Sequence, residues 1–126
     1  MDKRGFLDLI ISLLPGLCLK DRICLCEYFA REEDLFSSSK TDIEKILGHG
    51  LELFWVIDTI RAIAERNAEI CRMRSINWVS WNQEAYPQAL REIFDPPAGL
   101  FFRGQLPGPQ KSLLAMVGTR RPSPEA

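Results

Sequence analysis

Apolar residues recur at intervals of three and four along the first 74 positions of the chain, a pattern typical of amphipathic helices. Breaker residues interrupt this pattern at Pro15-Gly16 and at Gly48-His49-Gly50. Thr41-Asp42-Ile43-Glu44 matches a capping box, in which a hydroxyl and a carboxylate satisfy free N–H groups at a helix start. The sequence therefore predicts a small helical bundle. Its helices span residues 2–14, 20–30, 32–36 and 51–73, with one more from Thr41 to the Gly48 turn.

The last predicted helix, residues 51–73, carries the longest apolar stripe. Two interpretations of this stripe are open, a face packed in the core or a groove for a partner protein. Short neighbouring helices need a common core, so we expect the stripe to supply it. Its members are Leu53, Val56, Ile57, Ile60, Ile63, Ala64, Ile70 and Cys71.

The pattern changes at Ser75, where segments rich in β-formers replace the helical periodicity. We predict short strands over residues 76–80, 100–103 and 113–117, and a short helix from Tyr86-Pro87 to Leu90. The third of these strands is an unbroken apolar run, as expected of a strand buried on both faces. A domain boundary near residue 74 follows.

A phosphate-binding turn is predicted directly after the third strand, at Gly118, Thr119 and Arg120. Glycine lets the backbone approach an anion, free N–H groups and a hydroxyl can donate to it, and a guanidinium can pair with its oxygens. Arg121 adds a second positive charge. The alternative is that Gly118 only ends a strand and that both arginines are solvated.

Charge is distributed unevenly along a chain whose composition, 46% hydrophobic and 26% charged, is ordinary for a globular protein. Residues 1–71 hold 9 Lys/Arg and 13 Asp/Glu, a net charge of −4. Residues 72–126 hold 7 and 4, a net charge of +3. We therefore expect a polyanion to meet the second part of the chain.

The four cysteines do not predict a metal site. Cys24 and Cys26 lie two apart on a predicted helix and so point to different sides, and the single histidine, His49, has no partner at ligand spacing. Reduced thiols in the cytoplasm are expected, with no metal and no cofactor.

The N-terminal segment resembles an export signal, because basic residues precede an apolar stretch. Asp8 interrupts that stretch, however, and Leu17 is large for a cleavage site that requires small residues. Arg4, Asp8 and Ser12 fall four apart on one polar stripe, so an amphipathic first helix explains the pattern better. No segment is long and apolar enough to predict a membrane span.

A set of motifs in residues 75–124 resembles the DNA-processing protein A (DprA/Smf) family. Each motif alone is weak, but their shared order and spacing are specific. They are Trp78-Val79-Ser80, Tyr86-Pro87, Leu90 with Ile93, Asp95-Pro96-Pro97, Leu100-Phe101, Arg103-Gly104 and Val117-Gly118-Thr119-Arg120.

The resemblance implies two domains. Residues 1–74 are expected to form a helical domain of the sterile-alpha-motif (SAM) or helix-hairpin-helix kind, and residues 75–126 the N-terminal fragment of a Rossmann-like α/β domain. Members of the family bind single-stranded DNA during natural transformation and load the RecA recombinase, without a catalytic step. Gly118, Thr119 and Arg120 match the family's phosphate-binding turn, and Arg121 is a second candidate contact.

The chain also departs from the family pattern. It lacks the second glycine-rich loop, the lysine and aromatic residue that hold the strand, and the family's homodimer surface, so we expect a truncated protein that binds DNA weakly or not at all. One alternative is that the acidic helical bundle is itself a protein-interaction module of a recombination or competence complex. Another is hydrolysis of nucleoside monophosphates, which the absence of a suitably placed carboxylate disfavours.

Overall fold

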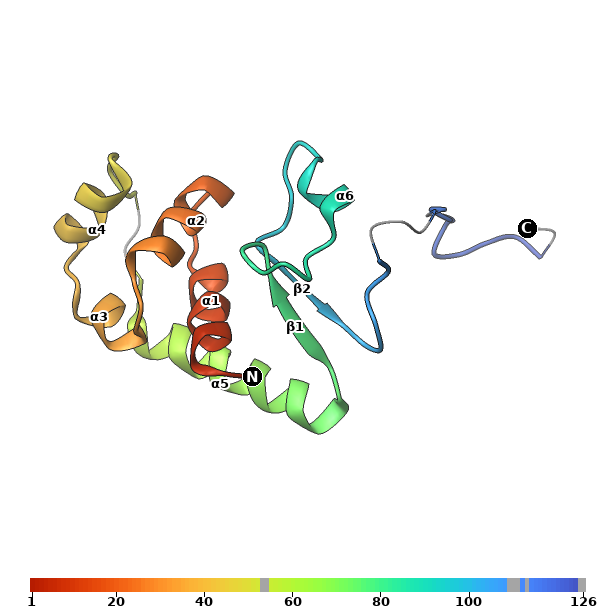
Figure 1. The fold of residues 1–126 in the computed structure, drawn as a ribbon, viewed down its shortest axis with the longest axis horizontal. Helices are drawn as coiled ribbons and strands as arrows, with labels where there is room; N and C mark the ends of the chain where they lie inside the picture. Colours follow the sequence, from red (N-terminus) through yellow and green to blue (C-terminus); the bar gives the residue numbers. More distant parts are fainter. Residues whose placement is uncertain (53–54, 109–111, 113, 125–126) are drawn as a thin grey trace.

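The structure is a computed structural model that describes residues 1–52, 55–108, 112 and 114–124. This part of the chain is mostly helical and carries one small antiparallel sheet, so its class is α+β (Figure 1). The elements in chain order are α1 (Lys3–Leu13), α2 (Leu19–Tyr28), α3 (Glu32–Ser37), α4 (Lys40–Leu47), α5 (Ile57–Arg74), β1 (Asn77–Ser80), α6 (Gln88–Arg91) and β2 (Gly99–Phe102).

Helix α1 lies at the centre of the core and contacts α2, α5 and β1. Its N-cap is Asp2, whose carboxylate accepts a hydrogen bond from the Gly5 N–H at 2.7 Å. It ends before Pro15-Gly16, as predicted. Apolar side chains from α1 to α5 form one buried cluster, which explains why helices this short are stable together. Its fully buried members include Leu7, Ile10, Ile11, Leu25 and Ile43.

The capping box of α4 lies two residues earlier than predicted. Ser39 is the N-cap, its hydroxyl accepts from the Asp42 N–H, and the Asp42 carboxylate accepts from the Ser39 N–H, each at 3.2 Å. The predicted box from Thr41 to Glu44 is therefore wrong. The helix ends at Gly48 in the left-handed conformation, as expected of a glycine C-cap.

Helix α5 begins at Ile57 and not at residue 51. Leu51 and Trp55 are buried before the helix starts, and the Trp55 indole N–H donates to the Pro15 carbonyl at 3.3 Å. This tertiary contact competes with helical continuation of the segment. Leu53 lies outside the described residues.

The predicted core stripe of α5 separates into two faces. Ile60, Ala64 and Cys71 are buried, whereas Val56, Ile63 and Ile70 are exposed. The expectation that the whole stripe supplies the core is thus wrong.

Strands β1 and β2 pair antiparallel, with Trp78 opposite Phe101 and Ser80 opposite Gly99. The rings of Trp78 and Phe101 lie 4.7 Å apart between centroids. A Cβ on Gly99 would lie 2.2 Å from the Trp78 ring, so this ring packs directly over the glycine. Both predicted strands are confirmed within a residue at each end.

The predicted third strand is not formed in its described part. Residues 114–117 have no regular structure, and Leu114, Met116 and Val117 are 87%, 88% and 98% exposed; Leu113 lies outside the described residues. A strand needs a hydrogen-bonded neighbour, and among the described residues β1 and β2 pair only with each other. Figure 1 shows this segment running away from the hairpin.

An ion pair between His49 and Asp21 links the turn after α4 to α2. The His49 ring contacts the Asp21 carboxylate through Nε2 at 2.8 Å and the Gly50 carbonyl through Nδ1 at 2.9 Å. Two acceptors favour the doubly protonated ring, so the hydrogen bond to Asp21 and then that to Gly50 raise the pKa of His49. Burial acts to raise the pKa of Asp21, but hydrogen bonds from His49 and Cys18 outweigh it and lower that pKa.

We predict that His49→Gln destabilises the protein at pH 5.5 and has a much smaller effect at pH 8.5. The raised pKa of His49 adds stability that is complete below the pKa of histidine in the unfolded chain, and this stability is lost as the pH rises through the raised pKa of the folded protein. The lowered pKa of Asp21 adds stability that is lost only at strongly acid pH, when the carboxylate of the folded protein is protonated. Urea unfolding midpoints of both proteins at the two pH values test this. His49 is the only histidine, so no second imidazole contributes. An equal difference at both pH values would contradict the assignment.

Candidate nucleic-acid interface

The predicted phosphate-binding residues lie in the exposed segment that follows the hairpin. Gly118, Thr119, Arg120 and Arg121 are all exposed. The Thr119 hydroxyl accepts from the Arg121 N–H at 3.3 Å, which bends the chain locally. A Cβ on Gly118 would meet nothing within 4 Å. The structure therefore keeps the four residues together but brings no described residue of another element to them.

These residues are chemically free to meet an anion. Neither guanidinium makes an ion pair with any residue that the structure describes. Two adjacent unpaired guanidinium groups can each bind a phosphate through two parallel hydrogen bonds. The segment is thus accessible to a nucleic-acid backbone but is not held in a fixed shape by the fold.

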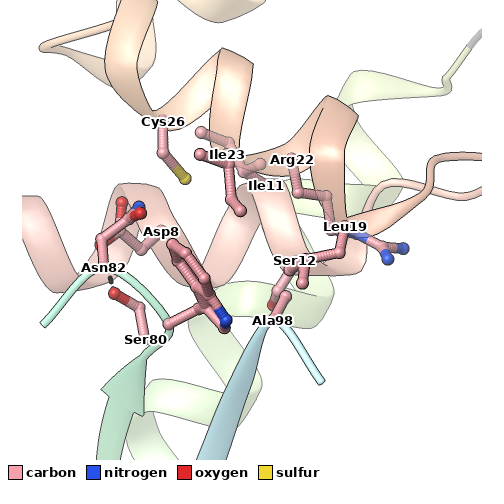
Figure 2. Close-up of a pocket in the computed structure, with 11 residues that line it drawn as sticks. Asp8, Ile11, Ser12, Leu19, Arg22, Ile23, Cys26, Ser80, Asn82 and Ala98 are labelled. Carbon is pink, nitrogen blue, oxygen red and sulfur yellow. Dashed lines mark hydrogen bonds between the residues drawn. The ribbon is translucent and has the colours of Figure 1, made fainter. Parts of the chain in front are cut away.

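A buried polar junction joins the hairpin to the helices (Figure 2). The Ser80 hydroxyl at the end of β1 donates to Asp8 Oδ2 on α1 at 2.8 Å, and both residues are buried. The other carboxylate oxygen of Asp8 lies 3.3 Å from Arg4 Nε. The polar stripe predicted on α1 thus faces the hairpin at Asp8 and not the solvent.

Arg4 extends this junction to the end of α2. Its guanidinium donates to the Phe29 carbonyl at 2.9 Å and also to the Cys26 carbonyl. The Cys26 thiol lines the same junction (Figure 2). Burial, followed by the negative charge of Asp8, raises the pKa of Cys26 to about 12, so this thiol stays protonated and unreactive at neutral pH.

The junction has no room for a substrate. The cavity between Asp8, Arg22, Cys26, Ser80 and Trp81 measures about 10 Å³, the size of a single water molecule. The four cysteines are free, and no cluster of potential metal ligands occurs within the described ranges. We assign the junction a role in positioning the hairpin.

Motif residues of the hairpin connection also serve to hold the structure. The Tyr86 hydroxyl donates to the Pro97 carbonyl at 2.8 Å, which links the Tyr-Pro motif to the double proline. Burial raises the pKa of Tyr86. The Arg91 guanidinium stacks near the rings of Trp81 and Tyr86, at 5.0 and 5.3 Å from their centroids. Tyr86 is therefore unavailable for stacking on a base.

Sequence reasoning missed the Asp8–Ser80 contact. The available signal was a carboxylate inside an otherwise apolar run, which disfavours a fully buried helix face unless a polar partner is present. Its partner lies 72 residues away in the sequence, and no local pattern indicates such a pairing.

Comparison with protein families identifies what the second part of the chain is similar to. The family described as DNA recombination-mediator protein A matches residues 77–126. This confirms the resemblance predicted from the motifs between Trp78 and Arg120. No curated protein and no solved structure matches the chain. None of the helices in the described ranges has the length and apolar character needed to cross a bilayer.

Proposed function

We propose that this chain, whose residues 77–126 match the DNA recombination-mediator protein A family, binds single-stranded DNA in DNA processing and recombination. The family match supports a role in DNA processing, and the finer statement about single strands is ours. In this proposal residues 1–74 are a SAM-like or helix-hairpin-helix-like domain, and residues 75–126 are the N-terminal part of a Rossmann-like domain.

The observation that carries the proposal is the exposed Gly118-Thr119-Arg120-Arg121 sequence at the end of the matched segment. An apolar run followed by glycine, a hydroxyl and a guanidinium suits a phosphate at the end of a buried strand. The exposure of Leu114, Met116 and Val117 supports this interpretation, because such a run is stable in water only when a neighbour covers it.

The proposed partners follow from the family. Single-stranded DNA is the ligand, and RecA is the protein that receives it, in the cytoplasm. The role is binding and transfer, with no bond made or broken by this chain. We expect the affinity to be low, because tight single-strand binding combines a basic groove with stacking aromatic rings, and Tyr86 is occupied within the fold.

Fluorescence anisotropy with labelled oligo-dT tests the site. We expect Arg120→Ala to weaken binding about five- to tenfold, on the order of 1 kcal/mol, because one charged interaction with a phosphate is removed. The slope of log affinity against log salt should fall by about 0.7 for each phosphate of a single strand that is no longer neutralised. Arg121→Ala should have a similar effect.

Arg72→Ala is the matched control. Arg72 is an exposed arginine of the same basic half, but Glu69 contacts it through two hydrogen bonds and neutralises its charge. This variant should therefore leave both affinity and salt slope near wild type. Equal losses in all three variants would indicate a general charge effect, and unchanged affinity for Arg120→Ala and Arg121→Ala would refute the phosphate assignment.

A further inference from the structure

A groove of about 760 Å³ lies between the segment around α6 and the loop that follows β2. Ala89, Phe102 and Leu106 belong to its apolar lining. Glu84 and Glu92 also line it, and they are the charged residues among its described lining. The groove is therefore suited to an apolar segment that carries positive charge.

The two carboxylates of the groove are not neutralised within the fold. Glu84 and Glu92 are exposed, and neither makes an ion pair with a residue that the structure describes. Arg91 lies in the same segment, but its guanidinium donates to the Gln83 carbonyl and stacks near the Trp81 ring. The negative charge of the groove thus remains available to a second cation.

The segment after the hairpin has the complementary properties. Leu114 and Met116 are 87% and 88% exposed. Side chains two residues apart share one face of an extended chain, so these two can enter a groove together. Arg120 and Arg121 follow them, and residues 114–124 contain no acidic residue. An apolar pair followed by two positive charges matches the lining of the groove.

The chain connection is long enough for this segment to reach the groove. Gly108 lines the groove, and Leu114 follows six residues later. Six extended residues span up to about 20 Å. A short tether of this kind gives an effective concentration on the order of millimolar, so even a weak contact is populated within one chain.

We propose that residues 114–121 form a strap that docks in this groove. Leu114 and Met116 then cover Phe102 and Leu106, which removes apolar surface of both partners from water. The extended strap of the structure and the docked strap are two conformations of the same chain, and the exposed apolar side chains favour docking.

Docking of the strap is an autoinhibitory contact, an inference that rests on the proposed function of Arg120 and Arg121 in binding phosphate. In the docked conformation these guanidinium groups pair with Glu84 and Glu92. A guanidinium that is paired with a carboxylate cannot bind a phosphate through the same N–H groups. Single-stranded DNA therefore has to displace the strap before it binds.

The amide NMR spectrum of the full chain tests docking without DNA. Replacing Leu114 and Met116 together with serine should release the strap and shift the amide signals of Ala89 and Leu106. Val117→Ser is the matched control, because Val117 points to the opposite face of an extended strap and should leave these signals in place. Groove signals that stay unchanged in the double variant, or that shift equally in the control, would overturn the proposal.

Fluorescence anisotropy with labelled oligo-dT tests autoinhibition. Glu84→Gln combined with Glu92→Gln should strengthen binding at least threefold, because both arginines are released. The control combines Asp58→Asn with Glu65→Gln, which removes the same charge from exposed positions of α5 outside the groove. Equal strengthening in the two double variants would indicate a general charge effect and would exclude autoinhibition.

The two tests separate this inference from the proposed function. Unchanged groove signals together with DNA binding that depends on Arg120 would overturn the strap and leave the proposed function intact. Groove signals that shift as expected, with no DNA binding in any variant, would refute the proposed function and with it autoinhibition, while docking of the strap would stand.

Discussion

Replacing Asp8 with alanine is expected to lower the free energy of unfolding by about 2 kcal/mol and to release the hairpin from α1. The substitution leaves the Ser80 hydroxyl buried without its acceptor, which costs about 1–3 kcal/mol for a polar group. It also removes the ion pair with Arg4, which adds little because the Arg4 side chain is 46% exposed. Urea denaturation followed by circular dichroism measures the change.

Asp34→Ala is the control for this prediction. Asp34 also pairs with an arginine on its own helix segment, at 3.3 Å from Arg31, but both side chains are more than half exposed. An exposed pair of this kind contributes little, so the control should change stability by less than about 1 kcal/mol. Equal losses of unfolding free energy in the two variants would show that burial does not increase the contribution of Asp8 to stability.

A double-variant cycle separates the contact from other effects of the substitution. Ser80→Ala removes the hydroxyl that Asp8 accepts from, so Asp8→Ala should have a smaller effect in that background than in the wild type. Additive effects would mean that the 2.8 Å hydrogen bond does not couple the hairpin to α1.

Gly99→Ala is expected to disrupt the hairpin and to destabilise the protein by about 1–3 kcal/mol. The added methyl group would lie 2.2 Å from the Trp78 ring, and atoms of this ring also lie at 2.4 and 2.8 Å, so the indole must move. Trp78 packs against Phe101, and its displacement therefore disturbs the cross-strand pair as well. Urea unfolding and the two-dimensional NMR spectrum of the indole N–H groups measure the effect.

Gly108→Ala is the matched control, because a Cβ at that position would meet nothing within 4 Å. It should leave stability and the Trp78 indole signal near wild type. If Gly99→Ala left stability and the Trp78 indole signal unchanged, Trp78 would not pack directly over Gly99.

The helices were predictable because the sequence marks their ends. Pro15-Gly16 and Gly48 stop two of them, and the apolar spacing between such breakers identifies the rest. The predicted start of α4 at Thr41 was wrong, because the Ser39 hydroxyl and the Asp42 carboxylate form the capping box. Only the structure shows which hydroxyl caps the helix.

Elements that depend on distant contacts were not predictable. The α5 start shifts because the indole of Trp55 bonds to the carbonyl of Pro15, 40 residues earlier. The α5 stripe separates into buried and exposed faces because the neighbouring helices cover only one side, and periodicity alone does not indicate how wide a face they cover. The apolar run before Gly118 lacks a neighbouring strand among the described residues, so its propensity does not produce a strand.

The candidate site was predictable in composition but not in geometry. The sequence shows a glycine, a hydroxyl and two arginines in a row. The structure shows all four residues exposed, and neither guanidinium makes an ion pair with a described residue. Whether they hold a phosphate stays a prediction, since a binding turn needs groups from other elements to fix its shape.

The distance along the chain between Asp8 and Ser80 has a consequence for how the protein assembles. The α1–α2 and α2–α4 contacts join segments that are close in sequence, and such contacts form early because closing a short loop costs less entropy. The hydrogen bond between α1 and β1 closes a loop of 72 residues and is made by a hairpin that is complete only at Phe102. We therefore expect α1, α2 and α4 to pack together before the hairpin docks on α1, and this docking to remove water from the Asp8 carboxylate.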